Sequence, residues 1–202
     1  MRRFLFAIVI GLMLLAAAAL GQQKTPSAEA KREDAAVPLY VGVKSCRICH
    51  KSKRMGNQYG AWLKGPHAGA YATLSSEASV KIAREMGLKT AAEEAPECLS
   101  CHSTAHGLRK EEVKGALKLE DGVQCESCHG PGNDYKKLPV MMDHGKAVES
   151  GLWEISEKTC LKCHNEQSPT FSGFEFRTAI AGITHAPPIE APPESTETHA
   201  VP

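Results

Sequence analysis

Four copies of one five-residue pattern constrain this 202-residue chain more than any other feature of its sequence. Each copy reads Cys-x-x-Cys-His, and the copies span Cys46–His50, Cys98–His102, Cys125–His129 and Cys160–His164. The chain has eight cysteines, and all of them belong to these motifs. Successive motifs begin 52, 27 and 35 residues apart. This uneven spacing indicates a recurring binding element rather than a true sequence repeat.

The pattern is typical of covalent heme attachment. Two thiols three residues apart on a helical turn reach the two vinyl groups of one porphyrin edge and form thioethers with them. The histidine that follows then lies beneath the ring, where an imidazole nitrogen can ligate the iron. The sequence therefore predicts four hemes c, attached through Cys46, Cys49, Cys98, Cys101, Cys125, Cys128, Cys160 and Cys163. The predicted proximal iron ligands are His50, His102, His129 and His164.

Three other uses of paired cysteines compete with this interpretation. They are disulfides in an exported protein, tetrahedral zinc sites and a redox-active dithiol. None of the three requires a histidine after every pair. Histidine occupies only 9 of 202 positions, so its presence after all four pairs favours heme.

The remaining histidines supply candidates for the second axial ligand of each iron. By position, the predicted distal ligands are His67, His144 and His185. His106 follows His102 by four residues, which keeps it near the proximal side of the second heme, and His199 lies in the C-terminal tail. The methionines are interpreted as packing residues. Three distal histidines for four hemes leave one heme as the candidate for five-coordination.

The expected secondary structure is helical, with no convincing alternating strand. A helix is predicted over residues 67–87, because apolar residues recur four apart and Gly87 suits its C-terminus. A second helix is predicted over residues 142–150, ended by Gly151, and a turn over residues 130–132. Aromatic residues make up only 5% of the chain, so the cofactors are expected to fill its interior, packed by Tyr59, Trp62 and Phe174.

Both ends of the chain differ from its middle. Residues 1–21 have the layout of a secretory signal peptide, with Arg2 and Arg3 before an apolar run, which predicts export to the periplasm. The alternative is an uncleaved N-terminal membrane anchor. Residues 22–38 are predicted to be a disordered linker, 39–185 the heme-binding domain, and 186–202 a disordered Pro-rich tail. Without residues 1–21, 22 basic and 23 acidic side chains remain, which gives no indication of nucleic-acid binding.

Several stretches of the chain resemble the tetraheme cytochrome c-554 family. They are Val41-Gly42, Trp62-x4-His67-Ala, the run from Gly122 to Gly132 around the third motif, and the late fourth motif. That family shares its heme arrangement with the octaheme hydroxylamine oxidoreductases. The resemblance covers about residues 39–185, and departs from the family at His106, where similar proteins carry an aromatic residue, and in the short segment after the fourth motif.

The resemblance implies a mainly α fold, with short helices and loops packed around closely paired hemes. It implies that His67, His144 and His185 complete three bis-His hemes, and that the heme of Cys98, Cys101 and His102 is five-coordinate. Members accept electrons from a partner oxidoreductase, pass them on, and can react with nitric oxide at the open heme.

Three functions follow for comparison. The first is an electron carrier between donor and acceptor redox proteins, with no catalytic residues of its own. The alternative is a heme enzyme that acts on a small nitrogen or sulfur oxide at one five-coordinate heme. The third is a structural module of a filament or a larger complex.

Overall fold

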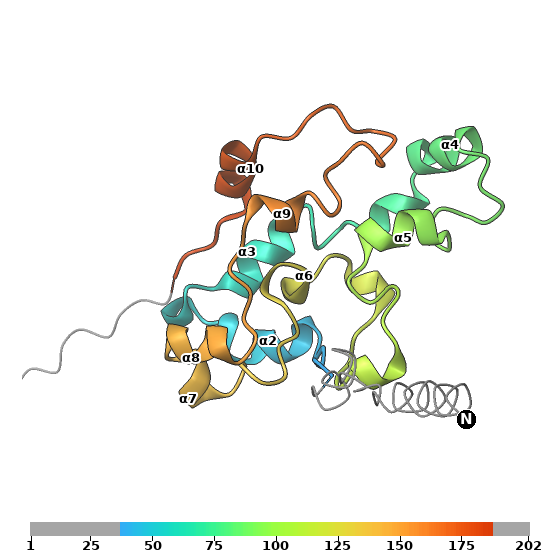
Figure 1. The fold of residues 1–202 in the computed structure, drawn as a ribbon. Helices are drawn as coiled ribbons and strands as arrows, with labels where there is room; N and C mark the ends of the chain where they lie inside the picture. Colours follow the sequence, from blue (N-terminus) through green and yellow to red (C-terminus); the bar gives the residue numbers. More distant parts are fainter. Residues whose placement is uncertain (1–36, 188–202) are drawn as a thin grey trace, which may run out of the picture. The chain divides into compact units, whose positions relative to one another are not determined.

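The structure is a computed structural model that describes residues 37–187 of the chain (Figure 1). The predicted signal peptide, most of the predicted linker and most of the predicted tail lie outside these residues, so their boundaries stay predictions. Within residues 37–187, none of the helices combines the length and the apolar character needed to cross a membrane.

Short helices joined by loops make up the described part of the chain (Figure 1). Between residues 37 and 187, β-structure is limited to one isolated parallel bridge, between Tyr40 and Val113. The predicted helical fold class is therefore confirmed. The α-helices are α2 (Val43–His50), α3 (Gln58–Lys64), α4 (Glu77–Glu85), α5 (Pro96–His102), α6 (Cys125–His129), α7 (Leu138–Met141), α8 (His144–Glu149), α9 (Glu157–Cys160) and α10 (Phe176–Ile183). The 3-10 helices are η2 (Lys53–Met55), η3 (Ala72–Ser75), η4 (Lys110–Glu112) and η5 (Leu119–Asp121).

The helix predicted over residues 67–87 is wrong in its first half. Residues 67–71 form turns, η3 follows, and α4 begins only after Ser76, whose side chain accepts a hydrogen bond from the Ser79 amide. A serine at this position caps a new helix and ends the preceding turn, because its hydroxyl satisfies an amide that has no partner within the helix. The C-terminal part of the prediction is correct, since Gly87 follows α4 with a φ of +70°.

The helix predicted over residues 142–150 begins slightly later than expected. Asp143 caps α8 by accepting a hydrogen bond from the Lys146 amide at 3.1 Å, so Met142 belongs to the end of α7. Gly151 ends the helix as predicted, with a φ of +100°. The helix break predicted after the third motif is present, because α6 stops at His129 and Gly130 has a φ of +78°, but residues 130–132 are irregular and the turn begins only at residue 133.

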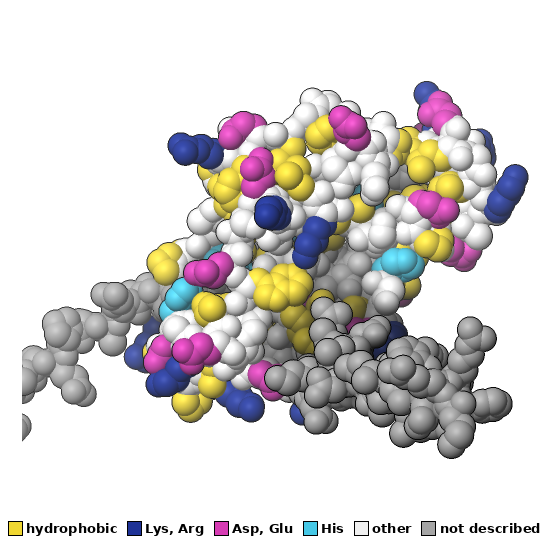
Figure 2. Space-filling model, viewed as in Figure 1, with side chains coloured by type: hydrophobic (Ala, Val, Ile, Leu, Met, Phe, Trp, Pro, Cys, Tyr) yellow, Lys and Arg dark blue, Asp and Glu magenta, His cyan; other side chains and the backbone are white. Residues whose placement is uncertain are grey.

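The polypeptide supplies only a small apolar core of its own. Nine hydrophobic residues are buried between residues 37 and 187, and four of them are alanines. Leu74 and Leu99 form the main cluster with Ala83 and Ala92, where α4 and α5 meet. Large apolar side chains remain exposed among charges of both signs (Figure 2), including Ile48, which is 74% exposed. Protein atoms alone therefore bury little of the apolar surface on the motif helices.

The capping role of Ser76 predicts a measurable loss of stability. Ser76→Ala should lower the free energy of unfolding by about 1 kcal/mol, because the Ser79 amide loses its acceptor. Ser75→Ala is the matched control, since the Ser75 hydroxyl is exposed and only donates to the Ala72 carbonyl. Guanidinium unfolding followed by far-UV circular dichroism checks the difference, and equal effects of the two substitutions would contradict the cap.

Candidate heme-binding sites

The four motifs occupy similar local structures. Helices α2, α5 and α6 each end at the histidine of their motif, so both cysteines of each pair lie on one or two turns of the same helix. The fourth motif begins at Cys160, the last residue of α9, and continues into turns that carry Cys163 and His164. Each motif therefore presents two thiols from one compact turn, as attachment to a single porphyrin edge requires.

Hydrogen bonds orient two of the motif histidines through Nδ1. His102 Nδ1 lies 2.6 Å from the Ala70 carbonyl oxygen, and because this oxygen only accepts, the histidine donates. His50 Nδ1 lies 3.0 Å from the side-chain oxygen of Gln58, whose amide nitrogen donates to the Ala186 carbonyl. A proton held on Nδ1 leaves Nε2 as the unprotonated nitrogen, which is the form that ligates a metal.

Two predicted distal histidines lie opposite motif histidines. The ring centroids of His67 and His164 are 6.1 Å apart, and those of His129 and His185 are 5.9 Å apart. Two imidazoles on opposite sides of one metal ion, with metal–nitrogen bonds of about 2 Å, place their centroids about 6 Å apart. Both pairs therefore have the separation that trans ligation of one iron requires.

Burial lowers the pKa of three of these imidazoles, which favours their neutral form. The pKa of His67 is lowered, first by burial and then by the charge of His164. The pKa values of His129 and His185 are also lowered, in both cases mainly by burial. Neutral imidazole is the ligating form of histidine, so the surroundings favour the protonation state that iron binding needs.

The third predicted distal ligand, His144, is not found in a ring pair among residues 37–187. It is exposed at the start of α8. Figure 1 shows α8, which begins at His144, well apart from α5, which carries the second motif. His106 is likewise absent from the ring pairs of the described residues, and is half-buried in the turns after α5.

Thiols of different motifs lie next to one another. The pKa of Cys46 is raised, first by a hydrogen bond with Cys125 and then by burial, so the first and third motifs meet there. The pKa of Cys163 is raised to about 12, first by burial and then by Cys101 of the second motif. The pKa of Cys128 is raised by burial and then by Cys160, which joins the third and fourth motifs. Neighbouring motifs therefore follow the order first, third, fourth, second.

The segment before the third motif fixes the position of His67. The Val123 amide donates to the His67 carbonyl at 3.0 Å, and the Trp62 indole nitrogen donates to the Val123 carbonyl at 2.8 Å. A Cβ on Gly122 would lie 2.7 Å from the carbonyl oxygens of both His67 and Ala68. Only glycine allows this close approach, since no other residue leaves room for the two carbonyls.

A family model for cytochrome c554 and c-prime matches residues 45–130, which contain the first three motifs and the His67 segment. The chain is thus similar to the cytochrome c-554 family over its first three motifs. Cytochromes c carry covalently bound heme c, and the imidazole separations and the hydrogen-bonded Nδ1 atoms fit that group.

Two comparisons with individual proteins agree with this assignment. Cytochrome c-554 of Nitrosomonas europaea is 28% identical over 119 residues, which are 55% of this chain and 44% of that protein. The matched part thus spans less than half the length of this relative. The solved structure of reduced cytochrome c554 from Nitrosomonas europaea is similar to 72% of this chain and covers 83% of its own, with a TM-score of 0.53 and 23% identity. This likeness supports the helical cytochrome c554 fold.

Aromatic side chains pack on the third and fourth motifs. Phe174 stacks on the His164 ring, with centroids 5.1 Å apart and planes inclined by 23°. The Trp153 ring lies over the backbone of Gly130, where a Cβ would be 2.7 Å from the indole nitrogen, and Lys162 Nζ lies 4.4 Å from its centroid. Trp153 therefore contacts both the third motif, at Gly130, and the fourth motif, at Lys162.

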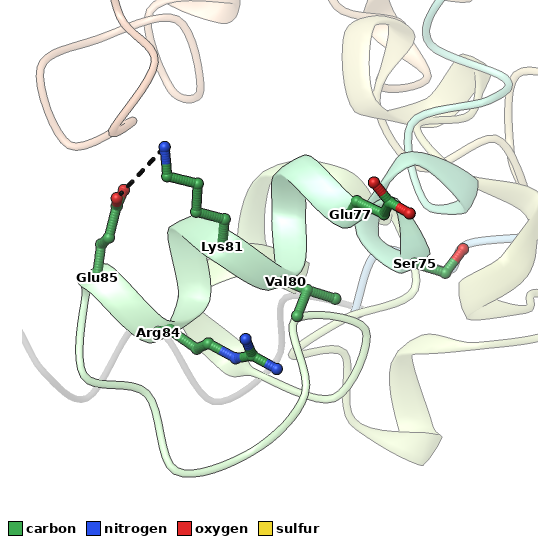
Figure 3. Close-up of a pocket in the computed structure, with 6 residues that line it drawn as sticks. All are labelled: Ser75, Glu77, Val80, Lys81, Arg84 and Glu85. Carbon is green, nitrogen blue, oxygen red and sulfur yellow. Dashed lines mark ion pairs between the residues drawn. The ribbon is translucent and has the colours of Figure 1, made fainter.

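A cavity on the protein surface is lined by none of the motif residues. It measures about 410 Å³ and follows the outer side of α4 from Ser75 to Glu85 (Figure 3). Its rim carries the exposed Lys81–Glu85 ion pair, at 3.8 Å, and contains no histidine or cysteine. This hollow is consequently not a heme site.

The other interpretations of the paired cysteines were disulfides, zinc sites and a redox-active dithiol. All eight cysteines have free thiols, and no group of three or more histidine, cysteine or acidic side chains gathers around a metal position between residues 37 and 187.

Sequence reasoning missed two side chains that organise the motifs. Gln58 links the His50 ring to the backbone next to His185, and no local pattern marks it. Glu126 is buried between the first and third motifs. Its position inside a Cys-x-x-Cys pair is a signal, because a charged residue there either faces solvent or has a structural partner.

The Trp62 hydrogen bond predicts a specific loss of stability. Trp62→Phe should lower the free energy of unfolding by about 1 kcal/mol, because the Val123 carbonyl loses its donor. Trp153→Phe is the matched control: among the described residues, its indole nitrogen makes no hydrogen bond. Unfolding in guanidinium checks the difference, and a larger effect of the Trp153 substitution would contradict the importance of this hydrogen bond.

Proposed function

We propose that this chain is an exported tetraheme c-type cytochrome that carries electrons between redox protein partners. The separation of the two histidine pairs, 6.1 and 5.9 Å, is the observation that carries the proposal. Heme c supplies an iron centre that takes up and releases one electron. Two imidazole ligands would occupy both axial positions of the iron, so that no small molecule could bind there. The pairs support His67 with His164, and His185 with His129, as axial ligands.

His144 is assigned to the first motif in this proposal. Its helix lies well apart from α5 in Figure 1, and the third and fourth motifs already have partners. His50 is then the remaining motif histidine on the same side. The eight motif cysteines hold the four groups covalently, and His102 is left without an imidazole partner.

The order of the motifs supports conduction through the protein. Hydrogen bonds between thiols join the first motif to the third and the fourth to the second, and Cys128 of the third motif lies within reach of the charge of Cys160 of the fourth. This arrangement would bring the edges of hemes held by neighbouring motifs close together. Electrons would enter near one end of this series and leave near the other, with one protein partner docking at each end.

Export and partners belong to the same proposal. The leader-like residues 1–21 support a periplasmic location, or attachment to the membrane through an uncleaved leader. The near-neutral balance of charges supports redox proteins rather than nucleic acids as partners.

Mass spectrometry of the mature protein from its native host tests the cofactor content. The expected mass exceeds that of the polypeptide by four hemes, and digestion should recover one heme on each motif peptide. A mass without this increase, or with zinc in place of iron, would rule the proposal out.

Removing one distal ligand tests the axial assignments. His67→Ala should convert one low-spin iron to high-spin, because the iron at His164 loses its second imidazole. His106→Ala is the matched control, since it removes another half-buried histidine that lies outside the ring pairs of the described residues. Magnetic circular dichroism of the oxidised proteins measures spin states. A full low-spin signal in His67→Ala, or its loss in His106→Ala, would overturn the assignment.

A second candidate function is supported by the surroundings of His102. Among residues 37–187 its ring is held by Ala70 and Thr73, and the ring pairs do not include it. An open iron at this motif would suit binding of a small nitrogen or sulfur oxide. Cyanide or nitric oxide should then change the spectrum of one iron of four. No spectral change would leave electron transfer as the function.

A further inference from the structure

Glu126 is among the most buried side chains in the protein, although it is charged. Its side chain is 1% exposed and lies on α6, between the two cysteines of the third motif. One carboxylate oxygen accepts from the amides of Val41, at 2.9 Å, and Gly132, at 2.7 Å. The other accepts from the Gly42 amide at 2.8 Å. The carboxylate thus joins the third motif to the residues immediately before α2.

Among residues 37–187, no positive side chain pairs with this carboxylate. The ion pairs found among the described residues do not include Glu126. All of its hydrogen-bond partners are donors, which suits the ionised, acceptor-only form. Its balancing charge is instead the partial positive charge of backbone amides at the N-terminus of α2. Partial charges of this kind offset a full negative charge only in part, so a net negative field remains around the site.

The field of Glu126 reaches the first motif and also Tyr135, which follows the third motif. The pKa of the Cys46 thiol is raised first by its hydrogen bond with Cys125 and by burial, and the charge of Glu126 raises it further. Burial raises the pKa of Tyr135, and the charges of Cys46 and Glu126 add to this shift. Glu126 therefore opposes new negative charge at the junction of the first and third motifs, and favours positive charge there.

We propose that Glu126 is a buried anion shared by the first and third motifs, and that it lowers the reduction potentials of both of their hemes. This inference rests on the proposed function, because it requires heme at both motifs. Reduction adds one electron to each iron and removes one unit of positive charge from it. A fixed negative charge nearby stabilises the oxidised iron, and burial keeps water and salt from screening the interaction.

Glu97 provides a natural comparison within the same chain. It directly precedes Cys98 of the second motif, but its side chain is exposed. Its charge adds to a raised pKa of Cys98 that is caused first by burial. Because water screens an exposed carboxylate, removing Glu97 should change the nearby potential much less than removing Glu126.

Redox titration of holoprotein variants tests the proposal. Glu126→Gln keeps the size of the side chain and removes its charge. Two of the four hemes should then become easier to reduce, by about tenfold or more in the equilibrium constant, which is about 59 mV for one electron. Glu97→Gln should change any heme by less than about threefold. Glu126→Asp retains the charge and should keep both potentials close to those of the unchanged protein.

The outcomes separate this inference from the proposed function. If the unchanged protein lacks four hemes, the proposed function fails first. If Glu126→Gln carries four hemes with unchanged potentials, Glu126 serves only to join the two motifs and the inference is wrong.

A variant that adds charge covers the case in which Glu126→Gln does not mature. Gln124 is also 1% exposed, and its side-chain oxygen accepts from the Val43 amide at 2.7 Å. Gln124→Glu places a second carboxylate beside the same two motifs, and should lower two potentials further. Unchanged or raised potentials in Gln124→Glu would overturn the inference. Failure of both variants to mature, while Glu97→Gln matures normally, would also overturn it in favour of a folding role.

Discussion

The hydrogen bonds made by the stretch from Gly122 to Gly132 hold the four motifs together. Val123 binds the backbone of His67 and the indole of Trp62, which sets the His67 segment against the third motif. Three residues later, the Glu126 carboxylate binds the amides that precede the first motif. Secondary structure contributes little to this arrangement, because the helices are short and the described residues form no sheet. The order of the motifs thus depends on a few buried polar contacts between distant residues.

Covalent cofactor attachment explains how such a fold can be stable. Residues 37–187 bury nine hydrophobic residues, four of them alanine, so this part of the chain gains little from its own apolar packing. Thioether bonds and paired imidazoles would add links between segments that share few apolar contacts. The helices that end at motif histidines then position the attachment residues, and Phe174 and Trp153 pack against the motifs. Spacing between motifs can vary widely under this arrangement, as the intervals of 52, 27 and 35 residues illustrate.

Local patterns predicted the helical class, the end of α6 before Gly130 and the ends of two further helices. They failed at residues 67–75, because a short apolar repeat resembles a helix while Ser76 and the contacts of His67 with Val123 impose turns. The heme-attachment residues stay a prediction from spacing, since attachment chemistry needs neighbours in sequence. The approach of His67 to His164 could not be predicted in this way, because 97 residues separate them and only tertiary packing brings their rings together. Glu126 and Gln58 were missed for the same reason, since each acts on residues far along the chain.

The central claim is that four covalently held hemes have three pairs of histidine ligands and one open position. Electron paramagnetic resonance of the fully oxidised protein measures this directly, because low-spin and high-spin ferric irons give separate signals. The account predicts three low-spin irons for each high-spin iron. Four low-spin irons would contradict the open position at His102, and fewer than three would contradict the histidine pairs.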